Sequence, residues 1–206
     1  PGMGYPLVPG YESVGVVREA GPESGRRAGE FVFVPGARCF GDVRGLFGGA
    51  ASRVVVAGER VIPVDERLGE DAVLLALAAT AYHAIAGADP PGRAREPIGE
   101  PIGEPIAELI PELIIGHGVL GRLLARLAVM LGDAPVTVWE KDASRAGGAL
   151  GYRVIDPAAD ERRDYRVICD VSGDASLLDE LIARLAPGGE IVLAGFYHEP
   201  VSFSFP

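Results

Sequence analysis

The chain has few basic side chains for its length. Among its 206 residues, Lys and Arg total 19 against 29 Asp and Glu, which gives a formal net charge of −10. A surface with this charge repels the phosphates of nucleic acids and of anionic membranes, so neither is expected as a partner. The sequence also lacks an apolar run of the roughly 20 residues that a membrane-spanning helix needs, and residues 1–30 lack a signal-peptide pattern. These absences predict a cytoplasmic protein.

Cysteine is equally scarce in this sequence. Cys39 and Cys169 are the only two, which is too few for a disulfide framework or for a zinc site built of four thiolates. We expect Cys169 to lie in a core strand and Cys39 to lie in a loop.

The first third of the chain has the pattern of short β-strands. Residues 1–64 contain Val-rich runs separated by Gly and Pro, such as "YESVGVV", "EFVFVPG" and "ASRVVVAGERVIPV". From Gly69 to Gly87 the sequence becomes rich in Ala and Leu, with an acidic first turn and a final glycine. This stretch predicts a helix that joins two domains.

The segment at 96–112, "EPIGEPIGEPIAELIPE", nearly repeats a four-residue unit. A proline in every turn removes a backbone donor and clashes with the preceding turn, which excludes an ordinary helix. We expect an exposed loop here. A solvated linker, a feature peculiar to this chain and a binding segment are the open alternatives.

The second half of the chain alternates strand-like runs with helical patterns. The apolar runs are "ELII", "VTVWE", "YRVI", "YRVICDV" and "GEIVLAGF". Parallel neighbours must be connected across a face of the sheet, so this alternation predicts an α/β fold with a parallel sheet of five strands. A last helix, "ASLLDELIARL", is expected to bury one apolar stripe and to end at residues 187–189. The stripe consists of Leu177, Leu178, Leu181, Ile182 and Leu185.

Three glycines follow the first of these strands with the spacing G-x-G-x-x-G. Gly116 would make the tight turn, Gly118 would leave room for a pyrophosphate, and Gly121 would let the next helix pack closely on the strand. Helix N–H groups near Val119 and Leu120 would point at that pyrophosphate. The pattern is typical of a Rossmann-type dinucleotide site, with a plain strand-turn-helix as the alternative. The helix is expected to bury Leu123, Leu124, Leu127, Ala128 and Leu131.

An acidic residue stands where the adenosine ribose of such a cofactor is normally bound. Glu140 comes 19 residues after Gly121, and its carboxylate would accept hydrogen bonds from the ribose hydroxyls and repel a 2′-phosphate. We therefore expect NAD rather than NADP, although Lys141 and Arg145 lie close enough in sequence to weaken that repulsion. A solvated carboxylate at a strand end is the alternative. His117, at a variable position of the motif, is expected to be exposed.

The order of these parts resembles the medium-chain dehydrogenase/reductase superfamily, with a β-rich first part, a linking helix that contains "TAYHA", and a Rossmann-type half. The segments "LVPGYESVGVV" and "RVICDVSGDASLLDELIARLAPGGEIVLAG" are similar to blocks of that family. The resemblance implies a partial GroES-like catalytic β domain over 1–72, then a linking helix and a Rossmann dinucleotide-binding domain over 73–206. It implies an oxidoreductase, and it adds Ser172 and Gly195 to the residues that bind the cofactor.

One difference from the zinc-dependent members of this family affects the chemistry. They place a histidine ligand where this chain has Tyr11, and the helix "LLALAATAYHA" lacks the cysteine of their catalytic zinc site. The run "RCFGDVRGLFGG" lacks the clustered cysteines of their structural zinc lobe. A phenol with a pKa of about 10 is a poor zinc ligand, so we expect no metal. A general base must then take the proton of an alcohol substrate. The resemblance places Tyr11, Thr80 and His83 at the nicotinamide cleft as the candidates.

Three segments are more closely similar to superfamily members that oxidise a 1-hydroxyethyl group of a magnesium tetrapyrrole: "PGMGYPLVPGYESVG", "FVPGARCFGDVRGLFGGAASR" and "GHGVLGRLLARL". This resemblance implies a tetrapyrrole substrate and an internal fragment of a longer chain. Phe40 and Phe47 would stack on the macrocycle and Arg38 and Arg44 would meet a propionate, with aromatic packing and solvated arginines as the alternatives.

Two other functions are alternatives to this dehydrogenase activity. The first is a zinc-free quinone or enoyl reductase of the same superfamily, and the second is a nucleotide-binding chain without catalysis. The sequence leaves the oligomeric state open, with a homo-oligomer as one alternative.

Overall fold

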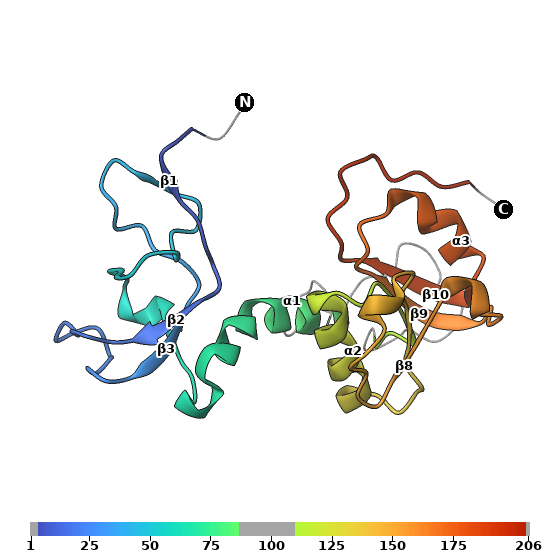
Figure 1. The fold of residues 1–206 in the computed structure, drawn as a ribbon, viewed down its shortest axis with the longest axis horizontal. Helices are drawn as coiled ribbons and strands as arrows, with labels where there is room; N and C mark the ends of the chain where they lie inside the picture. Colours follow the sequence, from blue (N-terminus) through green and yellow to red (C-terminus); the bar gives the residue numbers. More distant parts are fainter. Residues whose placement is uncertain (1–3, 87–109, 205–206) are drawn as a thin grey trace. The chain divides into compact units, whose positions relative to one another are not determined.

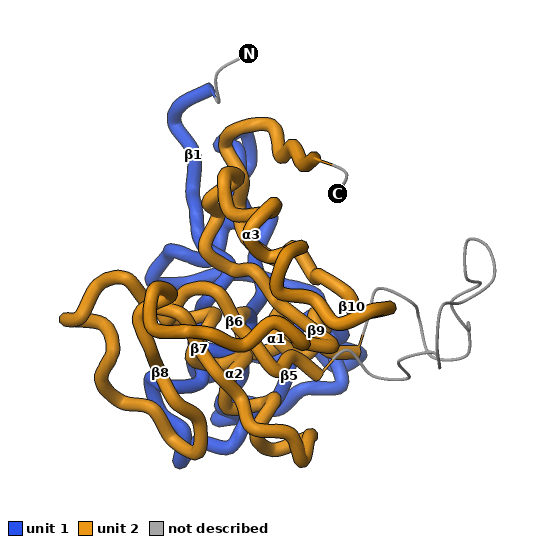
Figure 2. Tube along the Cα trace, turned by 90° about the vertical axis from the view of Figure 1, so that its right-hand side faces the viewer, with its two compact units in different colours: residues 1–76 blue, residues 77–206 orange. Residues whose placement is uncertain are grey.

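The computed structural model describes residues 4–86 and 110–204. The chain divides into two compact units, Pro1–Ala76 and Leu77–Pro206, which are coloured separately in Figure 2. The division between them falls four residues after the domain boundary expected at 72/73. Most of the repeat at 96–112 lies outside the described residues.

Unit 1 is built of short β-strands around a small core. Strand β2 (Ser13–Val16) pairs antiparallel with β3 (Phe31–Val34), and β3 pairs antiparallel with β5 (Ile62–Pro63). Strand β1 (Leu7–Val8) pairs parallel with β4 (Arg44–Gly45), and a 3-10 turn, η1 (Gly58–Arg60), precedes β5. The core of unit 1 consists of the buried residues Val32, Val34 and Val61, with Val17, Val54 and Val56 packed against them.

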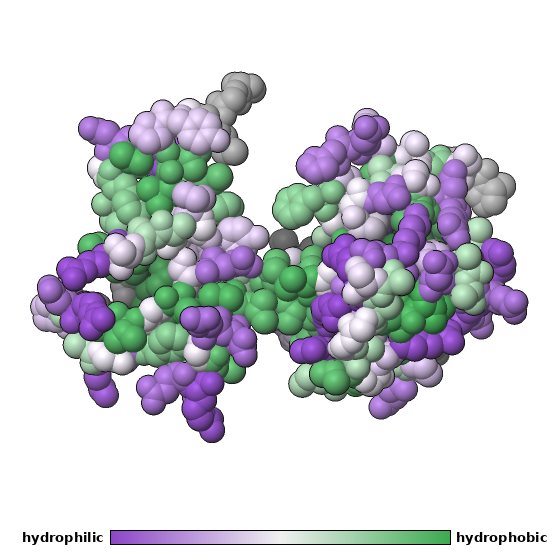
Figure 3. Space-filling view, in the orientation of Figure 1, coloured by the Kyte–Doolittle hydropathy of each residue, from purple (hydrophilic) through white to green (hydrophobic). Residues whose placement is uncertain are grey.

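One expected strand of unit 1 is absent from the structure. The Val-rich run at 54–56 forms no strand, although Val54 and Val56 still pack against the core. Hydrophobic residues therefore occupy part of the visible surface of unit 1, drawn in green among the hydrophilic residues in Figure 3. The exposed apolar side chains of this unit include Val16, Phe47, Val55 and Ile62.

The stretch expected to form one helix from Gly69 consists of two parts. A 3-10 segment, η2 (Glu66–Leu74), is broken at Gly69, whose φ of 51° and ψ of −133° are not helical, and the α-helix α1 (Leu75–Ala86) follows. By length and composition alone, the joined stretch Glu66–Ala86 passes as a candidate membrane span, a test that the core helix of a soluble protein also passes. Its α-helical part has 12 residues, against the roughly 20 that a span requires.

Unit 2 contains a parallel sheet, shown in Figure 1, whose strand order within residues 110–204 is β10-β9-β6-β7-β8. Every neighbouring pair of these five strands is parallel. The strands are β6 (Leu113–Ile115), β7 (Thr137–Trp139), β8 (Arg153–Ile155), β9 (Tyr165–Asp170) and β10 (Leu185–Leu193). The α/β fold with a five-stranded parallel sheet is thus confirmed.

Both faces of this sheet are covered, because alternate residues of each strand point to opposite faces. On one face, Ile114, Val138 and Cys169 pack against α1 and against α2 (Val119–Leu131). On the other face, Trp139 and Ile168 pack with Leu181 of α3 (Leu178–Ile182). Cys169 is buried in β9 and Cys39 is exposed, as expected.

The connections between the later strands contain short 3-10 turns. These are η3 (Ala143–Arg145), η4 (Pro157–Ala159) and η5 (Ala175–Leu177). The last helix ends at Ile182, and Leu185 pairs with Tyr165 as the first residue of β10, so the predicted helix end near 187 is wrong. Leu185 still packs beside Leu181 in the core, which is why the apolar stripe read as a longer helix.

A buried carboxylate connects strands β7 and β9 on one face of the sheet. Asp160 accepts hydrogen bonds from Trp139 Nε1 at 2.6 Å and from the Tyr165 hydroxyl at 2.7 Å. The Arg184 guanidinium donates to the Asp160 carbonyl oxygen and lies 5.0 Å from the centre of a Trp139 ring. The buried side chains of Trp139 and Tyr165 thus find a hydrogen-bond acceptor in Asp160, whereas Arg184 Nε has no partner among the described residues.

Candidate functional site

The residues expected to bind a cofactor gather at the carboxyl edge of the parallel sheet. The strand order β8-β7-β6-β9-β10 places β6 beside β9. After β6 the chain continues toward one side of the sheet, to β7 and β8, and after β9 it continues toward the other side, to β10. A crevice for a ligand forms at such a switch point. Predicted site residues follow four of the five strands at this edge, namely β6, β7, β9 and β10. These are Gly116, Gly118, Val119, Leu120 and Gly121 after β6, Glu140 after β7, Ser172 after β9, and Gly195 after β10.

The glycine turn has the geometry that its spacing requires. Gly116 has a φ of 101°, which favours glycine, and its N–H donates to the Trp139 carbonyl oxygen at 2.9 Å. Gly118 is the extended residue that precedes α2, and no side chain caps that helix. A Cβ atom at Gly121 would overlap the Gly116 carbonyl oxygen and touch Val171. A side chain at position 121 would therefore push the helix away from the turn.

Helix α2 presents its free amides to the same place. The first N–H groups of a helix have no partner within it, and here Gly118 offers them no side-chain oxygen. Val119 is exposed at the start of the helix, and Leu120 packs against the core. Leu124 and Ala128 are buried as expected, but Leu131, the last residue of the helix, is exposed.

Glu140 lies directly beside the glycine turn. Its Oε2 accepts a hydrogen bond from the His117 N–H at 3.1 Å and its Oε1 accepts one from the Asp142 N–H at 3.0 Å. The Arg145 Nε lies 3.9 Å from Oε2, and the side chain of Glu140 is 9% exposed. Burial raises the pKa of Glu140, but the two backbone N–H donors and Arg145 together lower it below its usual value. The residue is therefore an ionised carboxylate that is held beside the turn by the His117 N–H.

His117 is buried, so the expectation that it is exposed is wrong. The residue is 1% exposed, and both of its ring nitrogens have hydrogen-bond partners. Nδ1 lies 2.7 Å from the Arg145 carbonyl oxygen and Nε2 lies 2.8 Å from the Tyr152 hydroxyl oxygen. The glycine motif does not predict the burial of His117, because its partners Arg145 and Tyr152 lie at least 28 residues away in sequence.

Acid is expected to destabilise unit 2 through His117. Burial lowers the pKa of its imidazole, and the charges of Arg122 and Arg145 add to that effect against the opposing influence of the Arg145 carbonyl and Glu140. The folded-state pKa thus lies below the unfolded value of about 6.5, and the unfolded chain binds the proton first. The stability contributed by the neutral ring is therefore present above about pH 6.5 and is lost as the pH falls toward the folded-state pKa.

The measurement is thermal unfolding of the wild-type protein and of His117→Gln between about pH 7.5 and about pH 5.5. The wild-type melting temperature should fall more steeply than that of the variant, because only the wild type carries the titrating ring. Parallel profiles would contradict the assignment.

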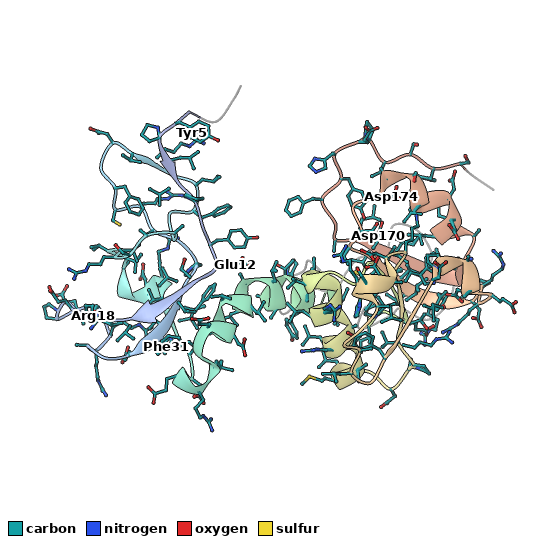
Figure 4. All side chains as sticks on the ribbon, viewed as in Figure 1. Tyr5, Glu12, Arg18, Phe31, Asp170 and Asp174 are labelled. Atoms are coloured by element: carbon teal, nitrogen blue, oxygen red, sulfur yellow. The ribbon has the colours of Figure 1, made fainter. Side chains whose placement is uncertain are left out.

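The end of β9 adds a second polar cluster to this edge. Asp170, labelled in Figure 4, accepts hydrogen bonds on Oδ1 from the Ser172 N–H and hydroxyl and on Oδ2 from the Tyr197 hydroxyl. A Cβ atom at Gly116 would lie 3.5 Å from the Ser172 Cα, and one at Gly195 would lie 2.8 Å from the Gly173 nitrogen. The segments after β6, β9 and β10 are therefore in close backbone contact. Sequence reasoning assigned no role to Tyr197, and no motif marks it.

The three residues proposed as proton acceptors belong to different units. Tyr11 lies in unit 1, where its ring meets that of Phe47 edge-on at a centroid distance of 5.0 Å. Thr80 and His83 are exposed on α1 in unit 2, one turn apart and away from the buried Ala81. Each unit thus presents its candidate residues at its own surface.

The residues expected to meet a flat substrate also lie in unit 1. Phe47 is 56% exposed and has a φ of 70°, a left-handed conformation that is strained for a bulky residue. Arg38 and Arg44 are exposed, whereas Phe40 is half-buried and would lie 3.0 Å from a Cβ atom at Gly48. Phe47 is therefore the better placed of the two phenylalanines to contact a ligand.

Solved structures with the same fold are dehydrogenases. A protein described as a zinc-binding dehydrogenase from Sinorhizobium meliloti, bound to NADP, matches 97% of this chain with a TM-score of 0.69 at 19% identity, and the match spans 64% of that protein. An alcohol dehydrogenase from Escherichia coli, in complex with NADH, matches 98% of the chain with a TM-score of 0.69 at 20% identity, over 65% of its own length. The chain therefore has the dehydrogenase fold, a Rossmann-type unit preceded by a partial GroES-like β unit.

Sequence comparison is more specific. The chain is 53% identical over all 206 residues to 2-desacetyl-2-hydroxyethyl bacteriochlorophyllide A dehydrogenase of Rhodobacter capsulatus, and it spans 60% of that protein. The enzyme of the same name from Cereibacter sphaeroides is also 53% identical, over 210 residues and again 60% of its length. No protein-family model matches the chain. The chain therefore resembles these two dehydrogenases along its whole length.

Proposed function

We propose that the protein oxidises the hydroxyethyl side chain of a bacteriochlorophyllide to an acetyl group with NAD, as a cytoplasmic step of bacteriochlorophyll a synthesis. The identity of 53% to two dehydrogenases named for this substrate supports the proposal. A tetrapyrrole is then the partner of the chain.

One observation carries the redox part of this proposal. The uncapped amino terminus of α2 follows a glycine turn at the switch point of a parallel sheet, and the ionised Glu140 lies beside that turn. Backbone amides of this kind bind a pyrophosphate, and a carboxylate in this place accepts hydrogen bonds from ribose hydroxyls. Glu140 favours NAD over NADP because its charge repels a 2′-phosphate.

The reaction removes a hydride from the carbinol carbon and a proton from its hydroxyl group, which leaves the ketone. Bound NAD supplies the hydride acceptor. The residues of this chain have the remaining tasks. The amides from Gly118 to Gly121 hold the pyrophosphate, Glu140 orients the adenosine ribose, and Ser172 and Gly195 border the other half of the cofactor. A base among Tyr11, Thr80 and His83 takes the hydroxyl proton.

The donor groups of the described residues do not fit a zinc site like those named for the structural neighbours. Within residues 4–86 and 110–204, no three His, Cys, Asp or Glu side chains lie close enough together to hold a metal ion. Tyr11 stands where a histidine ligand is expected, and zinc sites are built from Cys, His, Asp and Glu side chains. We therefore propose a reaction without zinc.

The function is tested by incubating the purified protein with NAD and the hydroxyethyl bacteriochlorophyllide. We expect NADH and the acetyl product to form in equal amounts. NADPH-driven reduction of an alkene or quinone, without oxidation of the alcohol, would favour the reductase alternative and overturn this proposal. Binding of NAD without turnover of any substrate would favour a nucleotide-binding role instead.

The proton route is tested with Tyr11→Phe and His83→Gln. Because general base catalysis contributes about a hundredfold or more to the rate, we expect kcat of at least one variant to fall by about that factor. Affinity for NAD should not change, since neither side chain is assigned to the cofactor. Normal turnover in both variants would contradict this route.

A further inference from the structure

A single buried side chain links the glycine turn to the loop at 141–152. The His117 ring contacts the Arg145 carbonyl oxygen at Nδ1 and the Tyr152 hydroxyl at Nε2. The backbone N–H of the same residue donates to Glu140 Oε2 at 3.1 Å. One residue of the turn therefore contacts the loop at Arg145 and at its last residue, Tyr152, and also binds the carboxylate that precedes the loop.

Arg122, in the first turn of α2, strengthens this link. Its Nη2 donates to the Arg145 carbonyl oxygen at 2.8 Å, its Nη1 donates to the Gly147 carbonyl oxygen at 2.7 Å, and its Nε donates to the His117 carbonyl oxygen at 3.2 Å. The Arg145 carbonyl thus accepts from the imidazole and from the guanidinium. Few backbone hydrogen bonds connect the loop at 141–152 to the turn. The hydrogen bonds of the His117 and Arg122 side chains therefore provide most of the connection between the two segments.

The hydrogen-bond partners define the tautomer of His117. A carbonyl oxygen can only accept, so the proton is on Nδ1, which donates to Arg145. In the neutral ring Nε2 is then an acceptor, and the Tyr152 hydroxyl donates to it. The titratable or charged groups that face the ring are Glu140, Arg145, Arg122 and Tyr152.

The position of the Arg145 side chain gives this link a functional consequence. A Cβ atom at Gly118 would lie 3.0 Å from Arg145 Nη2, and Arg145 Nε lies 3.9 Å from Glu140 Oε2. The guanidinium therefore borders both the start of α2 and the carboxylate, at the edge of the proposed dinucleotide site. Movement of the loop at Arg145 would displace one wall of that site.

We propose that His117 is a positioning residue of the dinucleotide site, which holds the 141–152 loop and its Arg145 side chain against the glycine turn without contacting the reacting atoms. The inference rests on the proposed dinucleotide-binding function. It predicts that cofactor affinity depends on the bond from His117 to the Arg145 carbonyl, and that the Tyr152 hydroxyl keeps the ring in the orientation that makes this bond.

The test compares His117→Asn with His117→Gln. The amide nitrogen of Asn takes the place of Nδ1 and can still donate to the Arg145 carbonyl, whereas the longer Gln side chain reaches toward Tyr152 instead. We expect the Kd for NAD, measured by titration, to rise about tenfold in His117→Gln and about threefold or less in His117→Asn, since loss of one buried hydrogen bond changes a binding constant by roughly that factor.

Two tyrosines provide a matched control. Tyr152→Phe removes the hydroxyl that contacts His117, and Tyr165→Phe removes one in the core on the other face of the sheet, where it donates to Asp160. Both variants should melt at lower temperature than the wild type. Only Tyr152→Phe should weaken NAD binding, so an equal loss of affinity in the two would show a general loss of stability and overturn the proposal.

Hydrogen exchange of the loop amides tests the same inference without a cofactor. We expect faster exchange at residues 142–147 in His117→Gln and Tyr152→Phe, and wild-type exchange there in Tyr165→Phe. Unchanged exchange and unchanged NAD affinity in His117→Gln would overturn the positioning role. The wild-type protein could fail to bind a dinucleotide while the loop amides still exchange faster in His117→Gln and Tyr152→Phe. That outcome would refute the proposed function and leave the link between His117 and the loop intact.

Discussion

Replacement of Gly121 by alanine is expected to abolish most of the affinity for NAD. The new Cβ would overlap the Gly116 carbonyl oxygen, and neither backbone can move without separating α2 from the glycine turn. Such overpacking costs about 1–3 kcal/mol of stability. The amides at the helix start would also move by a fraction of a residue length, so we expect the Kd for NAD to rise by about a hundredfold.

The matched control is Gly15→Ala in strand β2, where a Cβ atom would meet nothing within 4 Å. This variant should melt within a few degrees of the wild type and bind NAD normally. Calorimetric titration with NAD and thermal unfolding of both variants provide the measurement. Wild-type affinity in Gly121→Ala would mean that the close approach of helix and turn does not form the cofactor site.

Replacement of Glu140 by alanine is expected to have the second largest effect. Hydrogen bonds to a charged acceptor contribute about 1.5–3 kcal/mol, so the Kd for NAD should rise about ten- to hundredfold. The affinity for NADP should fall less or improve, because the charge that repels a 2′-phosphate is gone. The preference for NAD over NADP should therefore narrow.

Arg145→Ala is the control for this selectivity. It removes the cation that lies 3.9 Å from Glu140 Oε2, so it should weaken NADP binding more than NAD binding. Both Glu140→Ala and Arg145→Ala remove the ion pair between these two residues. That loss by itself should change the affinity for NAD and the affinity for NADP by the same factor. If the two variants shift the ratio of the NAD and NADP dissociation constants in the same direction, the assignment of Glu140 to the ribose is wrong.

The strands of unit 2 were predictable because each carries a local signal. Apolar runs such as "ELII" and "YRVICDV" are buried on both faces of a parallel sheet, and they lie at β6 and β9 as expected. The spacing of Gly116, Gly118 and Gly121 likewise predicted a tight turn followed by a helix, which the structure contains at Val119. These features depend on neighbouring residues only.

Other features depend on partners far away in sequence. Leu185 has the spacing of a helical stripe, but pairing with Tyr165 places it in β10. The Val54–Val56 run has strand character, but it lacks a neighbouring strand and packs against the core as irregular chain. The local hydrophobic pattern predicts that such side chains pack in a core. Whether they do so from a helix, a strand or an irregular segment depends on which other strands are available for pairing.

The sequence by itself determined the class of each half of the chain, the glycine turn and the acidic residue after the second strand of the sheet, because hydrophobic periodicity and glycine spacing act over a few residues. Only the tertiary structure decided that His117 is buried, that it binds Arg145 and Tyr152, and that the Arg145 guanidinium lies beside Gly118. These contacts join residues 27 to 35 positions apart, which come together only when the parallel sheet places β6, β7 and β8 side by side.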